Sequence, residues 1–161
     1  ESQLDFILER VGSLVDYCSV RQVVLALEPH LGDSLSEPER ALWLLSEISS
    51  PYLKLNFDIS HFDVQGLPTA LTVPLLAPHS AHTHVKDQRG QIPDFEFLIP
   101  GEGSFDFVHY LKEMEKSGYD GYITAEVSMQ VQKRPAYDPL AAADLTFRTL
   151  DNAFREAHIV R

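Results

Sequence analysis

Four short segments of this chain each run into a residue that can bind a divalent metal, and this pattern constrains the fold more than any other feature. The segments end in Ala26-Leu27-Glu28, Asn56-Phe57-Asp58, His82-Thr83-His84 and Thr124-Ala125-Glu126. Each follows an apolar or alternating run and precedes turn residues, as the carboxyl end of a β-strand does. Successive ligands lie roughly 26 to 42 residues apart, compared with about 30 for one βαβ unit. The spacing predicts consecutive parallel strands over 23–28, 53–58, 81–86 and 122–127.

Helical patterns alternate with these strands. Ser36 with Glu39 has the form of a capping box, Ser104 and Gly118 are expected to cap the two ends of one helix, and Asp138-Pro139 is a start signal. A shorter helical pattern is restricted by its prolines. The expected helices cover residues 4–15, 36–48, 68–76 and 105–117, with a last helix from 139 onwards.

The length of the chain limits how much of a barrel it can form. Residues 1–161 suit a single domain, whereas a (β/α)8 barrel typically needs about 250 residues and places its catalytic groups at the carboxyl ends of several strands. About four βα units are visible, and the chain enters a helical pattern without a preceding strand. We expect either the carboxyl-terminal half of a longer barrel or a half-barrel that pairs with a second copy.

The charge of the chain narrows its partners. The net charge of −11 opposes binding to nucleic acid, because lysine and arginine supply most of the affinity for phosphates. No run of about 18 apolar residues that could span a membrane is present, and the single cysteine, Cys18, excludes an internal disulfide. We expect a cytoplasmic protein with no nucleic-acid or membrane partner.

The stretch over 88–103 holds three glycines and two prolines between a strand and its helix. At roughly 16 residues it exceeds the two to six that are usual for a βα connection. Long loops at this end of a barrel commonly carry function, so the stretch is a candidate lid. A solvated loop is the alternative.

Taken in order, the four motifs resemble those of the xylose isomerase-like barrels, a family of sugar and sugar-phosphate isomerases, epimerases and related dehydratases. The resemblance covers nearly the whole chain and implies an α/β, TIM-barrel-type fold of which strands 5 to 8 are present. The motifs for these strands are Leu25-Ala26-Leu27-Glu28-Pro29, Asn56-Phe57-Asp58-Ile59-Ser60-His61, His84-Val85-Lys86-Asp87 and Gly118-Tyr119-Asp120-Gly121 followed by Glu126.

The resemblance implies one divalent metal ion, Mn, Mg, Co or Zn, held by Glu28, Asp58, His84 and Glu126. Such a site suits chemistry at a carbon next to a carbonyl, because a cation can chelate the substrate oxygens and stabilise the enediolate formed when the C–H bond loses its proton. In the epimerase branch, the two glutamates are both ligands and the acid/base pair, which assigns that role to Glu28 and Glu126.

Further residues are expected to contact the substrate. His61 resembles the substrate-contacting histidine of the family and suits the rim of the pocket, with a surface histidine in a turn as the alternative. Lys86 has the parity of His84 on the strand and is expected to polarise a substrate oxygen or to form a structural salt bridge. His82 is expected to pack in the core, and His30 to reach the pocket.

Basic residues in the loops after the last two strands suggest an acidic substrate. Arg89 and the Lys133-Arg134 pair lie where barrels frequently bind phosphate, although exposed basic residues are often only solvated. Glu102, between two glycines, is expected to serve the turn rather than catalysis.

Three functions remain open at this stage. The first is a metal-dependent sugar, sugar-phosphate or polyol isomerase or epimerase. The second is a dehydratase of a keto-polyol or related hydroxy-ketone, because loss of water β to a carbonyl begins with the same proton abstraction. The third is an inert half-barrel that folds by association, as a homodimer or with a missing amino-terminal half. An apurinic endonuclease shares the broader fold, but its site resembles a multi-metal centre richer in histidines.

Overall fold

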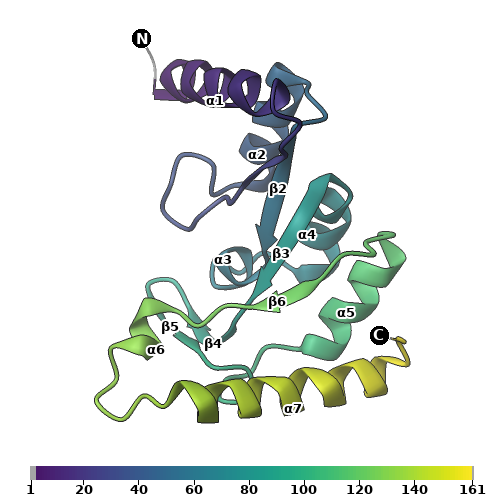
Figure 1. Cartoon of the computed structure of the whole chain (residues 1–161). Helices are drawn as coiled ribbons and strands as arrows, with labels where there is room; N and C mark the ends of the chain where they lie inside the picture. Colours follow the sequence, from purple (N-terminus) through teal and green to yellow (C-terminus); the bar gives the residue numbers. More distant parts are fainter. Residues whose placement is uncertain (1–2, 161) are drawn as a thin grey trace.

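A parallel four-stranded sheet forms the centre of the computed structural model, which describes residues 3–160 (Figure 1). The strands are hydrogen-bonded in the order β1-β2-β3-β6, so their order in space follows their order along the chain. This arrangement confirms the predicted TIM-barrel-like α/β fold. The bounds are β1 Leu25–Leu27, β2 Leu53–Asp58, β3 Ser80–Val85 and β6 Ile123–Ala125.

Helices connect and cover these strands. The sheet is flanked by α1 at one end and by α7 at the other, and α5 packs against both α4 and α7. Within residues 3–160, every helix is too short or too polar to pass through a lipid bilayer. The bounds are α1 Gln3–Ser19, α2 Pro38–Ile48, α3 Ser60–Asp63, α4 Thr69–Leu76, the 3-10 turn η1 Ala77–His79, α5 Phe107–Lys116, α6 Met129–Gln132 and α7 Pro139–Ala157.

The helix caps confirm some of the predicted signals and correct others. Asp138 caps α7 through its side chain, with Pro139 in the first turn. Gly118 follows α5 with φ 74°, and the amide of Tyr119 returns to the Met114 carbonyl, as in a Schellman motif. Ser104, however, is not the N-cap of α5: Asp106 takes this role and accepts from the His109 amide.

The capping box predicted at Ser36 is also wrong. Helix α2 begins after Glu37, and no side chain caps it. Pro38 occupies the first turn, where its fixed φ already suits a helix and its missing N–H needs no partner. The Ser36 amide is used instead in a turn closed on the Asp33 carbonyl.

The stretch over 88–103 is not an irregular loop. It forms an antiparallel hairpin of β4 Asp87–Gln91 and β5 Asp94–Leu98. Gly90 makes the tight end of the hairpin feasible, because its φ is 76° and a Cβ there would lie 2.3 Å from the Asp94 carbonyl oxygen.

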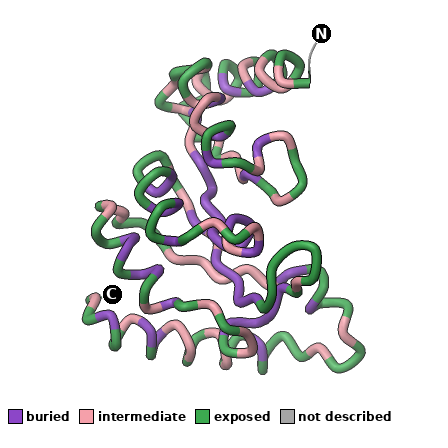
Figure 2. The backbone as a smooth tube through the Cα atoms, turned by 180° about the vertical axis from the view of Figure 1, so that it is seen from behind, coloured by how far each residue is buried: buried purple, intermediate pink, exposed green. Residues whose placement is uncertain are grey.

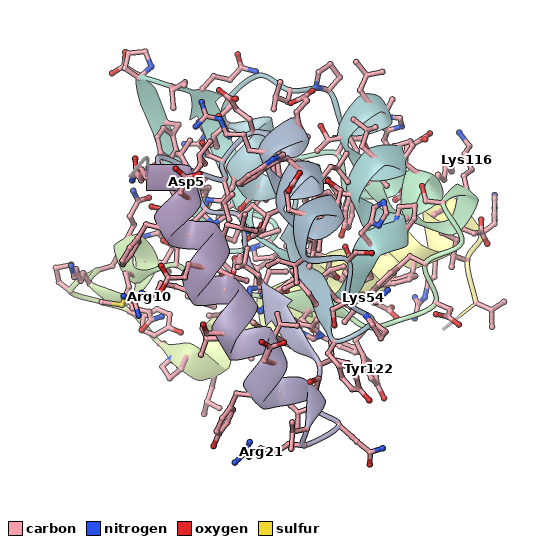
Figure 3. All side chains as sticks on the ribbon, turned by 90° about the horizontal axis from the view of Figure 1, so that it is seen from above. Asp5, Arg10, Arg21, Lys54, Lys116 and Tyr122 are labelled. Atoms are coloured by element: carbon pink, nitrogen blue, oxygen red, sulfur yellow. The ribbon has the colours of Figure 1, made fainter. Side chains whose placement is uncertain are left out.

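Burial concentrates between the sheet and the helices on one of its faces (Figure 2). The main core contains Phe57, Phe62, Tyr110 and Leu111, and a smaller core joins α1 and α2 to the start of the sheet. The charged side chains of Asp5 and Arg10 lie on α1, and Arg21 follows in the turn after it (Figure 3). The packed helices thus hold the sheet, while its two outer strands keep a free edge within the described residues.

Candidate active site

The four predicted metal ligands meet at the carboxyl ends of the strands. Glu28 directly follows β1, Asp58 ends β2, and Glu126 directly follows β6. His84 lies near the end of β3 and pairs with Asp58 in the register of the sheet. One ligand atom of each of these four residues lies within 4.8 Å of the other three. The geometry therefore brings together the quartet that the sequence predicts.

Hydrogen bonds fix the quartet on its outer side. The His84 Nδ1 atom lies 3.4 Å from Glu28 Oε2 and 3.3 Å from Glu126 Oε2. The Asn56 amide donates to Glu28 Oε2 at 3.0 Å and lies 3.2 Å from His84 Nδ1. Asn56 lies two residues before Asp58 on β2 and therefore faces the same side of the sheet. This alternation was a signal in the sequence that could have identified Asn56 as a site residue.

Asp58 and Lys86 form the buried floor of the site. Asp58 is fully buried, and its Oδ1 atom accepts from the Ser60 amide at 2.9 Å and from the Ser60 hydroxyl at 2.6 Å. The Lys86 ammonium donates to Asp58 Oδ2 and lies 2.6 Å from Glu126 Oε2. The prediction that Lys86 and His84 face the same side of the strand is confirmed, because both side chains reach the same cluster.

The charges of this floor stabilise one another. Burial alone would raise the pKa of Asp58, but the Lys86 ammonium, His61 and the hydrogen bonds from Lys86 and Ser60 together outweigh burial and lower that pKa. Burial likewise opposes the charge on Lys86, and Asp58 raises the pKa of Lys86. The pKa of Glu28 is raised, first by burial and then by the negative charge of Asp58. Glu28 is thus the carboxylate of the quartet that takes up a proton more readily than usual.

His61 lies in the floor rather than on the rim. It is 1% exposed, and its Nε2 atom lies 3.7 Å from both Glu28 Oε1 and Asp58 Oδ2. Among the described residues, neither ring nitrogen has a hydrogen-bond partner. Burial lowers the pKa of His61 to about 4, so the imidazole is neutral at neutral pH. The expectation of a rim position is wrong because α3 folds back over the end of β2.

Two further histidines differ in position. The ring centroid of His30 lies 3.9 Å from that of His61, with the two planes tilted by 44°, so His30 reaches the site from the segment after β1. His82 is only half-buried, and its ring contacts His84 edge-on. The expected core packing of His82 is wrong, because the open side of the four-stranded sheet does not enclose it.

Two of the three basic loop residues, Arg89 and Arg134, pair with acidic side chains outside the quartet. Arg89 pairs with Glu96 at 3.0 Å and donates to the Glu102 carbonyl. Arg134 pairs with the Glu102 carboxylate at 2.8 Å. Glu102 Oε2 also accepts from the Ile99 amide, which agrees with its expected role in the turn. A phosphate bound by these arginines would compete with carboxylates that already hold them.

The donor set suits a divalent cation. Three carboxylates and one imidazole supply hard oxygen and borderline nitrogen ligands, while the Lys86 ammonium offsets only part of their negative charge. Glu28 Oε1 is buried without a hydrogen-bond partner in the described residues. A buried, unpartnered carboxylate oxygen is costly unless a cation or donor meets it, so the residues fit a metal ion.

Comparisons with known proteins agree with the fold. The profile of the family described as xylose isomerase-like TIM barrel matches residues 1–150. Inosose dehydratase of Salmonella typhimurium is 23% identical over 96% of this chain and 56% of its own length. L-ribulose-5-phosphate 3-epimerase of Salmonella paratyphi A is 26% identical over 81% of this chain and 45% of its own length. The chain therefore spans about half the length of these curated relatives, which are a sugar epimerase and a dehydratase.

A comparison with a solved structure also supports the xylose isomerase-like barrel fold. A xylose isomerase-like TIM barrel protein from Mycobacterium smegmatis, in complex with magnesium, superimposes with a TM-score of 0.71 at 17% identity. The match covers 98% of this chain and 53% of that protein. It supports the fold and shows that this architecture accommodates a divalent cation in another protein.

Proposed function

We propose that this chain, which belongs to the xylose isomerase-like TIM barrel family, carries the divalent-metal site of a sugar or sugar-phosphate isomerase or epimerase. The observation that supports the proposal most is the convergence of Glu28, Asp58, His84 and Glu126 at the ends of four parallel strands. We further propose that the chain corresponds to the last four βα units of the barrel, as the order of its motifs suggests.

In this proposal the quartet holds one Mn, Mg, Co or Zn ion. When bound, the ion supplies Lewis-acid polarisation of a substrate carbonyl and its neighbouring hydroxyl. Glu28 and Glu126, the partly exposed carboxylates of the quartet, move the proton of the C–H bond on the carbon that bears this hydroxyl. Asp58, fully buried and held by Ser60, acts as a fixed ligand only.

The remaining residues bind and orient the substrate. The neutral imidazole of His61 has two ring nitrogens that are buried without a hydrogen-bond partner in the described residues, so a substrate hydroxyl that reached the floor of the site would satisfy one of them. Lys86 places a positive charge between Asp58 and Glu126, where it would stabilise negative charge that develops on a substrate oxygen. His30 closes the far side of His61, and Arg89 and Arg134 remain candidates for an acidic substituent at the outer end of the pocket.

Proton transfer predicts exchange with solvent. Incubation of the chain with Mn²⁺ and ketopentoses, ketohexoses or keto-inositols in D2O is expected to introduce deuterium at the carbon next to the carbonyl. Mass spectrometry and NMR measure the incorporation. Glu126→Gln should slow the exchange by about 10²–10⁴-fold, the range of general acid/base catalysis, while Glu102→Gln, outside the quartet, should not.

The outcomes separate the alternatives. Product without deuterium would contradict the acid/base roles of Glu28 and Glu126 and favour a hydride shift between carbons. Deuterium incorporation together with loss of a water molecule from the substrate would favour the dehydratase. The similarity to an inosose dehydratase is the observation that supports this alternative. Metal binding without exchange on any substrate would favour an inert half-barrel.

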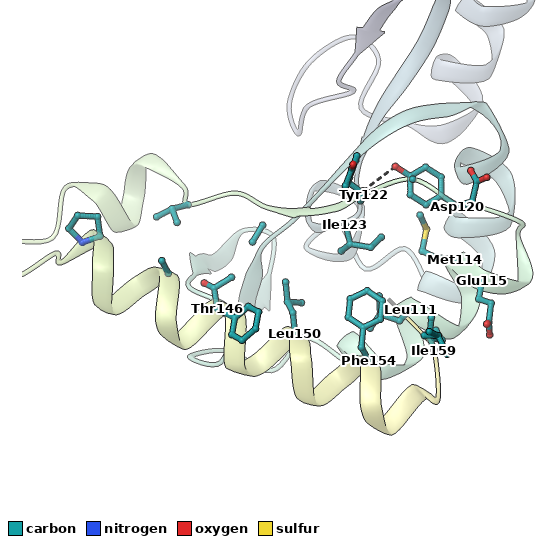
Figure 4. A pocket seen from close by; sticks show the side chains of 18 residues that line it. Leu111, Met114, Glu115, Asp120, Tyr122, Ile123, Thr146, Leu150, Phe154 and Ile159 are labelled. Atoms are coloured by element: carbon teal, nitrogen blue, oxygen red, sulfur yellow. Dashed lines mark hydrogen bonds between the residues drawn. The ribbon is translucent and has the colours of Figure 1, made fainter.

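We also propose that a second copy covers the free edges of the sheet. Strands β1 and β6 each pair on one side only within the described residues. Beside β6, side chains of α5 and α7 line an apolar groove of about 1030 Å³ that includes Ile123, Leu150 and Phe154 (Figure 4). A two-fold axis would pair β1 of each copy with β6 of the other and satisfy both edges at once.

Dimer formation is expected to depend on metal. Closing the barrel would bring the carboxylates of two quartets to the same end of it, where like charges oppose joint ionisation unless cations neutralise them. Sedimentation velocity should show a dimer that divalent metal strengthens and chelator weakens. Phe147→Lys, in the groove and 61% exposed, should shift the chain to monomer, while Leu71→Lys, 64% exposed but on α4, should not. A compact monomer under all conditions would reject the second copy and favour an amino-terminal half-barrel as the cover.

A further inference from the structure

The β4–β5 hairpin reaches the candidate site with the side chain of Phe97. This side chain is 8% exposed although it lies on a hairpin outside the central sheet. Its ring meets that of His61 edge-on, with centroids 5.4 Å apart and planes at 82°. The Lys86 Nζ atom lies over the same ring, 5.4 Å from its centroid. One aromatic ring therefore contacts both non-ligand groups of the floor.

The hairpin is held in place by bonds to the elements that carry the site. The Gln88 side-chain amide donates to the Asp63 carboxylate in α3, and the Ile92 backbone amide donates to the Val64 carbonyl just beyond it, both at 2.8 Å. On the other side, the Phe97 amide donates at 2.9 Å to the side chain of Gln130 in α6. Since α3 contains His61 and α6 closely follows Glu126, the hairpin is fixed relative to both ends of the cluster.

The Lys86 ammonium needs such a neighbour. It is 3% exposed, and a buried charge is costly unless every side is compensated. Asp58 and Glu126 occupy two sides. The face of an aromatic ring attracts a cation without a hydrogen bond and at the same time excludes water, so Phe97 suits the remaining side.

The His61 imidazole depends on the Phe97 ring for a different reason. Neither of its ring nitrogens has a hydrogen-bond partner among residues 3–160, so no bond sets the angle of the imidazole. The rings of His30 at 3.9 Å and Phe97 at 5.4 Å are its aromatic neighbours. Ring packing therefore orients His61, whose two nitrogens stay buried and without a partner in the described residues.

We propose that Phe97 is a positioning residue, whose ring holds the Lys86 ammonium and the His61 imidazole in place and keeps water from the floor of the site. The β4–β5 hairpin is then a fixed wall and not a mobile lid. What Lys86 and His61 do to a substrate rests on the proposed function, but their positioning by Phe97 does not.

Chemical labelling of Lys86 tests the proposal without substrate or metal. The whole chain, in chelator, is treated with acetic anhydride, and acetylation of Lys86 is followed by mass spectrometry relative to the exposed Lys116. Loss of a desolvated cation–π contact in Phe97→Leu should make Lys86 roughly tenfold more reactive, and Phe97→Ala should increase its reactivity further. Phe97→Tyr keeps the ring and should restore the slow rate.

Phe95→Leu is the matched control, because Phe95 lies on the same strand with its ring 5.2 Å from that of Phe97. Circular dichroism confirms that each variant is folded, and Phe97→Leu and Phe97→Tyr decide the question if Phe97→Ala does not fold. Wild-type reactivity of Lys86 in folded Phe97→Leu would overturn the proposal, as would equal acceleration by Phe95→Leu. Metal calorimetry on wild-type protein tests the proposed function separately.

Discussion

Replacing Asp58 with asparagine is expected to reduce the affinity of the chain for Mn²⁺ by at least about 100-fold, more than the 10–100-fold typical of losing an outer-shell partner. Asp58 is the fully buried member of the quartet. Its loss removes a fixed negative charge and leaves the ammonium of Lys86 facing the cation position with one carboxylate fewer. Isothermal titration calorimetry measures the affinity and the number of ions bound, expected to be one.

The asparagine variant is preferable to alanine for this test. Asparagine keeps an oxygen that can accept from the Ser60 amide and hydroxyl, so the turn after β2 retains its bonds. Alanine would leave those donors unpaired and Lys86 with Glu126 as its remaining carboxylate partner, and loss of folding would then obscure loss of binding. Glu102→Gln removes a carboxylate that pairs with Arg134 away from the quartet, and its affinity should match wild type. An unaltered affinity in Asp58→Asn would refute the quartet.

Replacing Asp87 with alanine is expected to destabilise the chain by roughly 3–5 kcal/mol, since each buried donor left without a partner costs about 1–3 kcal/mol. The Asp87 carboxylate is 2% exposed. It accepts from the backbone amides of Gln88, Gly101 and Gly103 at 2.9 Å and of Phe105 at 3.0 Å. Gly103 fits because a Cβ there would lie 2.3 Å from Asp87 Oδ1.

Urea denaturation followed by circular dichroism measures this loss of unfolding free energy. Asp106→Ala is the matched control, because Asp106 is an aspartate that accepts from one amide at an exposed helix start, and removing such a cap costs about 1 kcal/mol. If Asp87→Ala lost no more stability than Asp106→Ala, the four amide bonds would not anchor the segment between β5 and α5. The magnitude matters because total stabilities are only about 5–15 kcal/mol.

The sequence by itself determined the parallel sheet and the edge at which the four candidate ligands meet. Glu28, Asp58, His84 and Glu126 each end a strand pattern, and parallel neighbours bring their carboxyl ends to one side of a sheet. Their convergence follows from local periodicity and spacing alone. The caps at Asp138 and Gly118 were likewise readable, because each depends on a residue type within one turn of its helix end.

The predicted helix caps that were wrong involve residues whose groups are used elsewhere in the fold. Ser36 has the side chain of a cap, but Pro38 fixes the start of α2 and the Ser36 amide closes a different turn. Ser104 is drawn toward the Gln88 carbonyl, which leaves Asp106 to cap α5. The competition at Ser36 is local, between neighbouring turn and helix signals, whereas the competition at Ser104 comes from Gln88, 16 residues away, which no short window of sequence contains.

Only the tertiary structure decided what surrounds the ligands. The bonds that Asn56 makes to Glu28 and His84 span 28 residues, and Asp87 reaches across up to 18 residues to Phe105. Phe97 meets His61 and Lys86 because a hairpin folds over the ends of the strands. Periodicity fixes which side of its own strand a residue faces, whereas contacts between elements depend on how whole elements pack, and that packing is settled by the free energy of the complete fold.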